Sequence, residues 1–280
     1  MLLPRLVAAI VLFGPVIPAT GLVFSQDYPN KPVRIVTAAA GGTSDFAART
    51  LASGISPALG QPVVVDNRAI GNIATEVVSK EKPDGYTLLL GGASIWVFPF
   101  MQKVSYDPVR DFTPISLLAR DVKVVTVHPS LPVKSVKELI ALAKAKPGEL
   151  NYASTGIGGS QHLGAELLKS MAGVNIVHVP YKNQPVAIAA LMSGEVQVAV
   201  YDAAAVLPHA KSGKLRALAV TTAEPSSLTP GLPTVAATGL PGYEYIGLIV
   251  MVAPGKTPGA IINRLNQEMV RVLKLPDVKE

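Results

Sequence analysis

The sequence predicts an α/β fold, in which a parallel sheet is covered by helices on both faces, organised in two lobes. Apolar runs of four to seven residues alternate along the chain with longer segments of helical period, the pattern typical of such a sheet. The 280 residues, 49% of them hydrophobic, suffice for one large domain or two of about 100–150 residues. We expect two lobes.

Nine segments are predicted to form strands, because each is a short apolar run bounded by turn residues. They are residues 33–38, 62–65, 86–90, 122–127, 150–153, 176–179, 196–200, 215–221 and 246–252.

Three helices have clear boundary signals. One is expected to begin at Ser135, because Ser135 and Glu138 have capping-box spacing, and to end before Pro147. A second should run from about Ser160 and end at Gly173. Its buried stripe is expected to carry three side chains spaced four apart, Leu163, Leu167 and Met171. A third should follow Ser44-Asp45 and end near Leu59-Gly60.

The N-terminus predicts a secretory signal over residues 1–25. The first 20 residues are apolar apart from Arg5, and no further charge occurs before Asp27. The small Ser25 precedes a tolerable cleavage point at Gln26. The alternative is an uncleaved membrane anchor, but a spanning helix needs about 20 apolar residues and this stretch contains several prolines.

Composition excludes several function classes. The absence of Cys removes thiol nucleophiles, thiolate metal sites and redox switches. The formal net charge is +6, but Lys and Arg are scattered beside acids without interleaved aromatics, which disfavours nucleic acid as a partner. His128, His178 and His209 are too far apart in sequence to indicate a metal-ligand cluster. We therefore expect neither a cofactor nor a metal.

Three Gly/Ser-rich loops, at residues 38–45, 91–94 and 154–160, lie where a predicted strand gives way to a predicted helix. Ligands of α/β sheets bind beyond the carboxyl ends of the strands, where backbone N–H groups and helix N-termini favour anions. None of the three loops contains Lys or Arg. The pattern indicates a small anion held by neutral donors, and plain tight turns are the alternative for any single loop.

Nucleotide and hydrolase motifs are absent. Gln161 stands where the dinucleotide fingerprint requires Gly or Ala, no loop ends in Gly-Lys-Ser/Thr, and Gly-x-Ser-x-Gly does not occur. An enzyme, such as a hydrolase or isomerase using Ser160, His162 and an acid, is the competing hypothesis. Two such residues at a helix start do not by themselves align a nucleophile with a base, so ligand contact or capping is favoured.

Two aspartates leave alternatives open. A carboxylate beside a bound anion repels it unless the carboxylate is occupied elsewhere, and capping of the following helix would occupy Asp45. Asp45 could instead pair with an amino group on the ligand. Asp202, which follows a predicted strand, has the same two interpretations.

Many motifs, in order along nearly the whole chain after the signal, resemble the Bug family of periplasmic receptors for tripartite tricarboxylate transporters. Two of them are Gly41-Gly-Thr-Ser-Asp45 and His178-Val-Pro-Tyr-Lys182. The others occupy residues 27–36, 48–49, 59–68, 83–90, 106–112, 150–154 and 240–244. The resemblance implies a periplasmic binding protein fold of two α/β lobes, each a mostly parallel sheet flanked by helices, that close on a small solute without catalysis.

The resemblance also implies boundaries and partners. Two crossings near residues 120–124 and 243–247 would divide the chain into a first lobe of residues 26–121 and 246–280 and a second lobe of residues 122–245. The expected partners are an organic acid or amino-acid-like solute and integral membrane transporter subunits, with the receptor a periplasmic monomer. A sensor that reports the solute to a signalling partner is the alternative to an importer.

Carried over onto this sequence, the family's ligand loops give one set of candidate ligand-binding residues. The set is Ala39, Ala40, Gly41, Gly42, Thr43, Asp45, Ser94, Thr155, Gly156, Gly158, Ser160, His162 and Asp202. The chain departs from the family pattern at Ala39-Ala40, where Pro-Gly is usual. The family also continues beyond the motif at residues 275–280 with another strand and helix, so we expect a shortened, destabilised first lobe.

Overall fold

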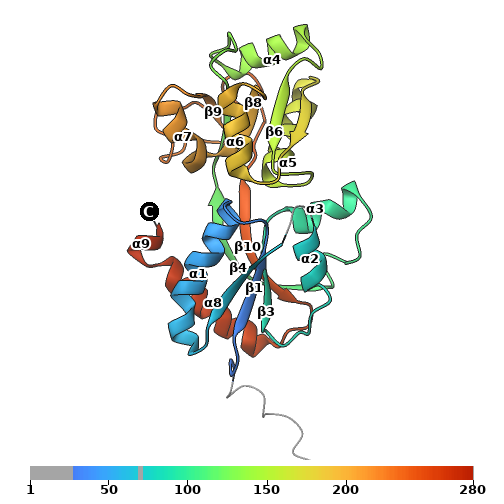
Figure 1. The fold of residues 1–280 in the computed structure, drawn as a ribbon, viewed down its shortest axis with the longest axis vertical. Coiled ribbons are helices and arrows are strands. Elements are labelled where there is room, and N and C mark those ends of the chain that lie inside the picture. Colours follow the sequence, from blue (N-terminus) through green and yellow to red (C-terminus); the bar gives the residue numbers. More distant parts are fainter. Residues whose placement is uncertain (1–27, 69–71, 280) are drawn as a thin grey trace, which may run out of the picture.

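The computed structural model describes residues 28–68 and 72–279, and these fold into two lobes, each built on a five-stranded sheet (Figure 1). The signal predicted for residues 1–25 lies outside the described residues. The two-lobed α/β fold class predicted from the sequence is confirmed.

The first lobe contains the sheet β2-β1-β3-β10-β4. Its strands are β1 (Val33–Thr37), β2 (Val63–Asn67), β3 (Thr87–Gly91), β4 (Phe112–Asp121) and β10 (Gly247–Pro254). Its helices are α1 (Thr43–Leu59), α2 (Ile73–Val78), α3 (Ser94–Met101), α8 (Gly259–Leu273) and α9 (Pro276–Lys279). Helices α1 and α8 cover one face of the sheet and α2 and α3 pack on the other, so both faces are buried.

The second lobe contains the sheet β7-β6-β8-β5-β9. Its strands are β5 (Lys123–Val127), β6 (Asn151–Ser154), β7 (Val177–Pro180), β8 (Val198–Asp202) and β9 (Arg216–Val220). Its helices are α4 (Val136–Ala145), α5 (Ser160–Ala172), α6 (Gln184–Ser193) and α7 (Ala203–Lys211). Helices α4 and α5 cover one face and α6 and α7 the other.

Each sheet is mixed. In the first lobe β1 pairs in parallel with β2 and β3, and in the second β6 pairs in parallel with β7 and β8, as the alternating pattern predicts. The antiparallel pairs all involve β10 or β5. These strands belong to the two crossings, where the chain enters the other lobe without a strand-helix-strand unit, so the parallel rule does not apply to them.

The long strand β4 is the element that the sequence pattern missed. It lies at the edge of its sheet, where Pro114 costs no ladder hydrogen bond, and its register with β10 shifts twice. Exposed positions such as Pro114 and Arg120 interrupt the apolar run that would mark a strand. Edge strands with one face toward solvent leave a weak signal of this kind.

Helix α5 begins at Ser160 and ends as predicted, with Gly173 in the left-handed conformation at φ 62°. Its predicted buried stripe is wrong, because Met171 is 40% exposed and Leu163 and Leu167 are only half-buried. The face that packs on the sheet carries smaller side chains, Gly164, Ala165, Leu168 and Ala172. Helix α4 is capped as expected, since Glu138 N–H donates to Ser135 Oγ.

Candidate ligand-binding site

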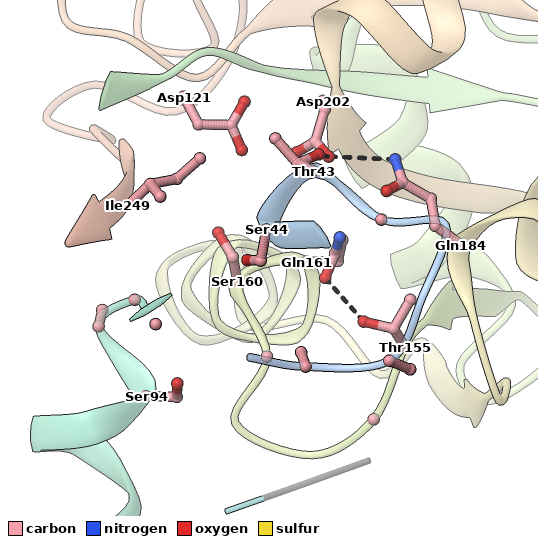
Figure 2. A pocket seen from close by; sticks show the side chains of 18 of the residues that line it. Thr43, Ser44, Ser94, Asp121, Thr155, Ser160, Gln161, Gln184, Asp202 and Ile249 are labelled. Carbon is pink, nitrogen blue, oxygen red and sulfur yellow. Dashed lines mark hydrogen bonds between the residues drawn. The ribbon is translucent and has the colours of Figure 1, made fainter. Parts of the chain in front are cut away.

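A cavity of about 180 Å³ lies between the lobes, where the loops that follow β1, β3, β6 and β7 meet the two crossings (Figure 2). An engineered cavity of about 150 Å³ holds a benzene ring, so this one has room for a small organic molecule. Both lobes contribute its walls, and the inner ends of β4, β5, β8 and β10 contribute its base.

Four helices begin at this cavity. Residues at or just before the N-termini of α1, α3, α5 and α6 line it, namely Thr43, Ser94, Ser160 and Gln184 among others. The first N–H groups of a helix have no partner within the helix, and the helix dipole adds partial positive charge at that end. The helix starts can therefore hold a carboxylate through neutral donors, and Lys182, which also lines the cavity, adds a positively charged side chain to them.

The structure brings most of the predicted ligand residues together in this cavity. Those that line it are Ala39, Ala40, Gly42, Thr43, Ser94, Thr155, Gly156, Ser160 and Asp202. Four predicted residues are not among the lining residues: Gly41, Asp45, Gly158 and His162.

Asp45 is occupied within its own lobe. Its carboxylate accepts hydrogen bonds from Gly41 N–H (3.0 Å), Asn67 Nδ2 (2.9 Å) and Arg49 Nε (3.0 Å). Burial opposes ionisation, but these bonds outweigh it and hold the pKa of Asp45 below its ordinary value. Gly42, not Asp45, is the N-cap residue of α1. Asp45 thus fixes the loop that precedes α1, and its charge is compensated within the first lobe and does not line the cavity.

His162 lies behind the second ligand loop. Its Nδ1 accepts from Gly158 N–H (3.3 Å), and its ring centroid is 4.6 Å from that of His178. His178 in turn contacts Ser154 Oγ at 2.6 Å. Burial lowers the pKa of both imidazoles, that of His178 to about 4, so both rings are neutral at pH 7. The two histidines support the loop from behind.

The geometry does not assemble the alternative catalytic site. Ser160 Oγ lies 3.2 Å from Tyr245 OH, and in the described ranges no hydrogen bond joins it to His162. Nucleophilic catalysis needs a base within hydrogen-bond reach of the nucleophile. Ser160 therefore contributes a hydroxyl group and the first residue of α5 to the cavity wall, and not a catalytic nucleophile.

A buried ion cluster that the sequence pattern does not predict lies at the base of the cavity. Lys123, whose side chain is 1% exposed, donates to Asp202 and to Asp121 Oδ2, the latter at 2.5 Å. Asp202 also accepts from Thr43 Oγ1 (2.5 Å) and Gln184 Nε2 (3.0 Å). Thr43 belongs to the first lobe and Asp202 to the second, so this hydrogen bond joins the lobes across the cavity. The only signal in the sequence is an acid and a lysine, Asp121 and Lys123, at a predicted crossing, with Asp202 at the end of a distant predicted strand.

The cluster perturbs its own ionisation. Burial opposes the charge of Asp202, but Lys123 and the surrounding donors hold the pKa of Asp202 well below its ordinary value. Burial would favour a neutral amine, yet the two carboxylates raise the pKa of Lys123. Burial raises the pKa of Asp121 to about 7, because Lys123 only partly compensates and Asp202 repels its charge.

In the part of the chain that the structure describes, no group of three or more His, Asp or Glu side chains is placed to hold a metal ion. Within the same ranges, no helix combines the length and the apolar character needed to cross a membrane.

A bilobal α/β fold with a small cavity between its lobes is shared with periplasmic binding proteins, among them BugD, whose structure is 32% identical with a TM-score of 0.83. Comparison with known proteins specifies the family. Residues 47–280 match the family model described as "Tripartite tricarboxylate transporter family receptor". The chain belongs to this family, as its motifs predict. Members are periplasmic solute receptors, and the protein is accordingly a receptor rather than an enzyme.

Individual relatives support the assignment. The protein BugT of Bordetella pertussis is 35% identical over 286 residues, covering 100% of this chain and 88% of BugT. The structure of Rhodopseudomonas palustris Rpa4515 with adipate is 37% identical, with a TM-score of 0.82 over 90% of this chain and 86% of that one. MatC of the same organism, with bound malate, is 29% identical, with a TM-score of 0.83 over 90% and 87%.

Proposed function

We propose that the protein is an extracytoplasmic receptor that captures a small carboxylate between its lobes and delivers it to the membrane subunits of a tripartite tricarboxylate-type transporter. The observation that carries the proposal is the convergence of four helix N-termini, those of α1, α3, α5 and α6, on one small cavity. Two similar proteins have structures with the carboxylates adipate and malate. Export to the periplasm through the predicted signal at residues 1–25 belongs to the same proposal.

The solute would act by stabilising the closed arrangement of the lobes. Its carboxylate would accept hydrogen bonds from the first N–H groups of α1 in one lobe and of α5 in the other, and closure of the lobes brings these donors together. A ligand shifts the population toward the closed state by its differential affinity for that state. The closed form would then be the form presented to the transporter.

Solute binding is tested with the full chain by isothermal titration calorimetry against a panel of organic acids, after native mass spectrometry of protein taken from cells identifies what co-purifies. Ser160→Ala and Thr155→Ala should each weaken binding about tenfold while melting normally, since each removes one hydroxyl from the cavity wall. Ser212→Ala, on the exposed end of α7, is the matched control. Unchanged affinity in both cavity variants would refute the site assignment.

Delivery requires a separate measurement. Proteoliposomes that contain the membrane subunits should take up the labelled acid only when the receptor is added. Uptake that is independent of the receptor, or receptor binding without any uptake, would exclude the importer and favour the sensor.

A further inference from the structure

The base of the cavity carries one negative charge more than it can neutralise internally. Asp121, Lys123 and Asp202 all line the cavity, and Lys123 is the single cation between two carboxylates. The other walls carry backbone, hydroxyl and amide donors together with the Lys182 side chain, and these groups suit an anion. The cavity is therefore polarised, with an acidic corner beside an anion-binding rim.

The spare acceptor of this corner belongs to Asp121. Both oxygens of Asp202 have donors, from Lys123, Thr43 and Gln184. Asp121 uses Oδ2 for Lys123, whereas among residues 28–68 and 72–279 no N–H or O–H group donates to its Oδ1; only a protonated Asp121 would hydrogen-bond to Asp202. Its side chain keeps 16% of its surface exposed. Figure 2 shows it at the edge of the pocket, beside Asp202.

The acidic corner adjoins the N-terminus of α5. A Cβ atom built on Gly247 would lie 2.9 Å from Ser160 Oγ and 3.1 Å from Asp121 Oδ2, so these two groups are neighbours across that glycine. The other groups around Asp121 are Lys123 from β5, Asp202 from β8 and the Tyr245 hydroxyl before β10. The N-terminus of α5, which favours a carboxylate of the solute, thus lies next to the Asp121 carboxylate, which can accept a further hydrogen bond.

We propose that the solute is an α-hydroxy or α-amino carboxylate, whose carboxylate lies at the N-terminus of α5 and whose hydroxyl or ammonium group donates to Asp121. This inference rests on the proposed function and adds the chemical class of the solute. If the bound carboxylate carried no such donor, Asp121 would receive no hydrogen bond from the solute and would lie next to its negative charge. Sites built to pair a polar group reject analogues that lack it.

Two matched series test the proposal by calorimetry at pH 8: succinate, malate and aspartate, and then glutarate, 2-hydroxyglutarate and glutamate. Within a series the carbon chain is constant and only the α substituent changes from hydrogen to hydroxyl to ammonium. We expect the donor-bearing acids of at least one series to bind about tenfold tighter or more than the plain diacid, the ratio typical of one charged hydrogen bond.

Asp121→Asn should remove this preference. The variant removes the charged acceptor while leaving Lys123 paired with Asp202, so the donor-bearing acids should lose about tenfold in affinity. The plain diacid should bind unchanged or tighter. Asp277→Asn, on the exposed α9, is the control and should leave every affinity unchanged.

The pH dependence of the unmodified chain gives a second readout, independent of how the variant folds. Asp121 must be ionised to accept from the ligand, and burial raises its pKa to about 7. Lowering the pH from 8 to 6 should therefore weaken aspartate binding, by up to about tenfold for each pH unit below that pKa, and strengthen succinate binding.

The outcomes separate the two proposals. Equal binding of plain and donor-bearing acids, or a preference that survives Asp121→Asn, would overturn this inference and leave the carboxylate receptor intact. Failure of every carboxylate in the wider acid panel to bind would refute the proposed function itself.

Discussion

Replacing Lys123 by Met should destabilise the protein strongly. The Lys123 side chain is 1% exposed, and its two partners, Asp121 and Asp202, have side chains 16% and 5% exposed. Removing one member of a buried ion pair leaves uncompensated charge and costs about 3–5 kcal/mol. Here two carboxylates lose their shared cation and face each other, so the free energy of unfolding should fall by at least the lower figure.

The matched control is Lys146→Met. Lys146 pairs with Glu149 at 3.1 Å, but both side chains are more than half exposed, and exposed pairs contribute about 0–1 kcal/mol. Urea denaturation of the full chain followed by circular dichroism gives both free energies of unfolding under the same conditions. The buried and exposed lysines should differ by about 2 kcal/mol or more.

The pH dependence of the deficit checks its cause. Without Lys123, mutual repulsion raises the pKa of the two carboxyls in the folded state above the unfolded value of about 3.9. The penalty is then absent below that unfolded value and grows as the pH rises, by up to about 1.4 kcal/mol per pH unit. A Lys123→Met variant as stable as Lys146→Met, or a deficit that does not change between pH 4 and 8, would refute the electrostatic reasoning.

Three further predictions concern closure of the lobes and the ligand loop. Thr43→Val removes the hydrogen bond to Asp202 across the cavity and should weaken solute binding about tenfold in calorimetry; unchanged affinity would mean that this bond does not favour closure. Gly158→Ala should weaken solute binding more than Gly213→Ala. Both glycines have φ near +73°, but a Cβ at Gly158 would lie 2.6 Å from the Phe98 ring of the first lobe, whereas a Cβ at Gly213 would have no neighbour within 4 Å. Equal losses of affinity would mean that backbone strain alone is responsible. The free energy of unfolding should fall by about 1–2 kcal/mol, after allowance for solvent screening, as the pH drops from about 6.5 toward 4, because the unfolded chain protonates His178 at a higher pH than the folded chain does. In urea denaturation at several pH values, His178→Gln should reduce this dependence on pH.

The sequence predicts the helix-covered core of the fold well. Most strands that pair in parallel contain a short run of apolar residues, and the helix caps at Ser135 and Gly173 are local signals that need no tertiary context. The edge strand β4 escapes this reasoning because packing on one side only leaves polar residues within it. The buried face of α5 lies one position further along the chain than the spacing of its large apolar residues predicts. A helix on a sheet can bury small residues such as Ala172 and expose a longer one such as Met171.

The candidate site divides in the same way. Gly/Ser loops and helix starts are contiguous in sequence, so residues such as Thr155 and Ser160 could be assigned to the cavity from the pattern alone. Lys123 could not, because its burial and its two partners result from pairing of β5 with β8. His162 fits a ligand-binding pattern in sequence but turns behind the loop, where burial favours its neutral form.

The acidic corner and the crossing share the same stretch of chain. Asp121 ends β4 in one lobe and Lys123 begins β5 in the other, so a single residue separates the group that faces the solute from the cation that anchors it. Substitutions at Asp121 that change which acid is bound would therefore also disturb the crossing between the lobes. Laboratory evolution toward a new specificity should accumulate substitutions first in the loops that follow β1, β3 and β6, where ligand contacts can change while the crossing is unaltered.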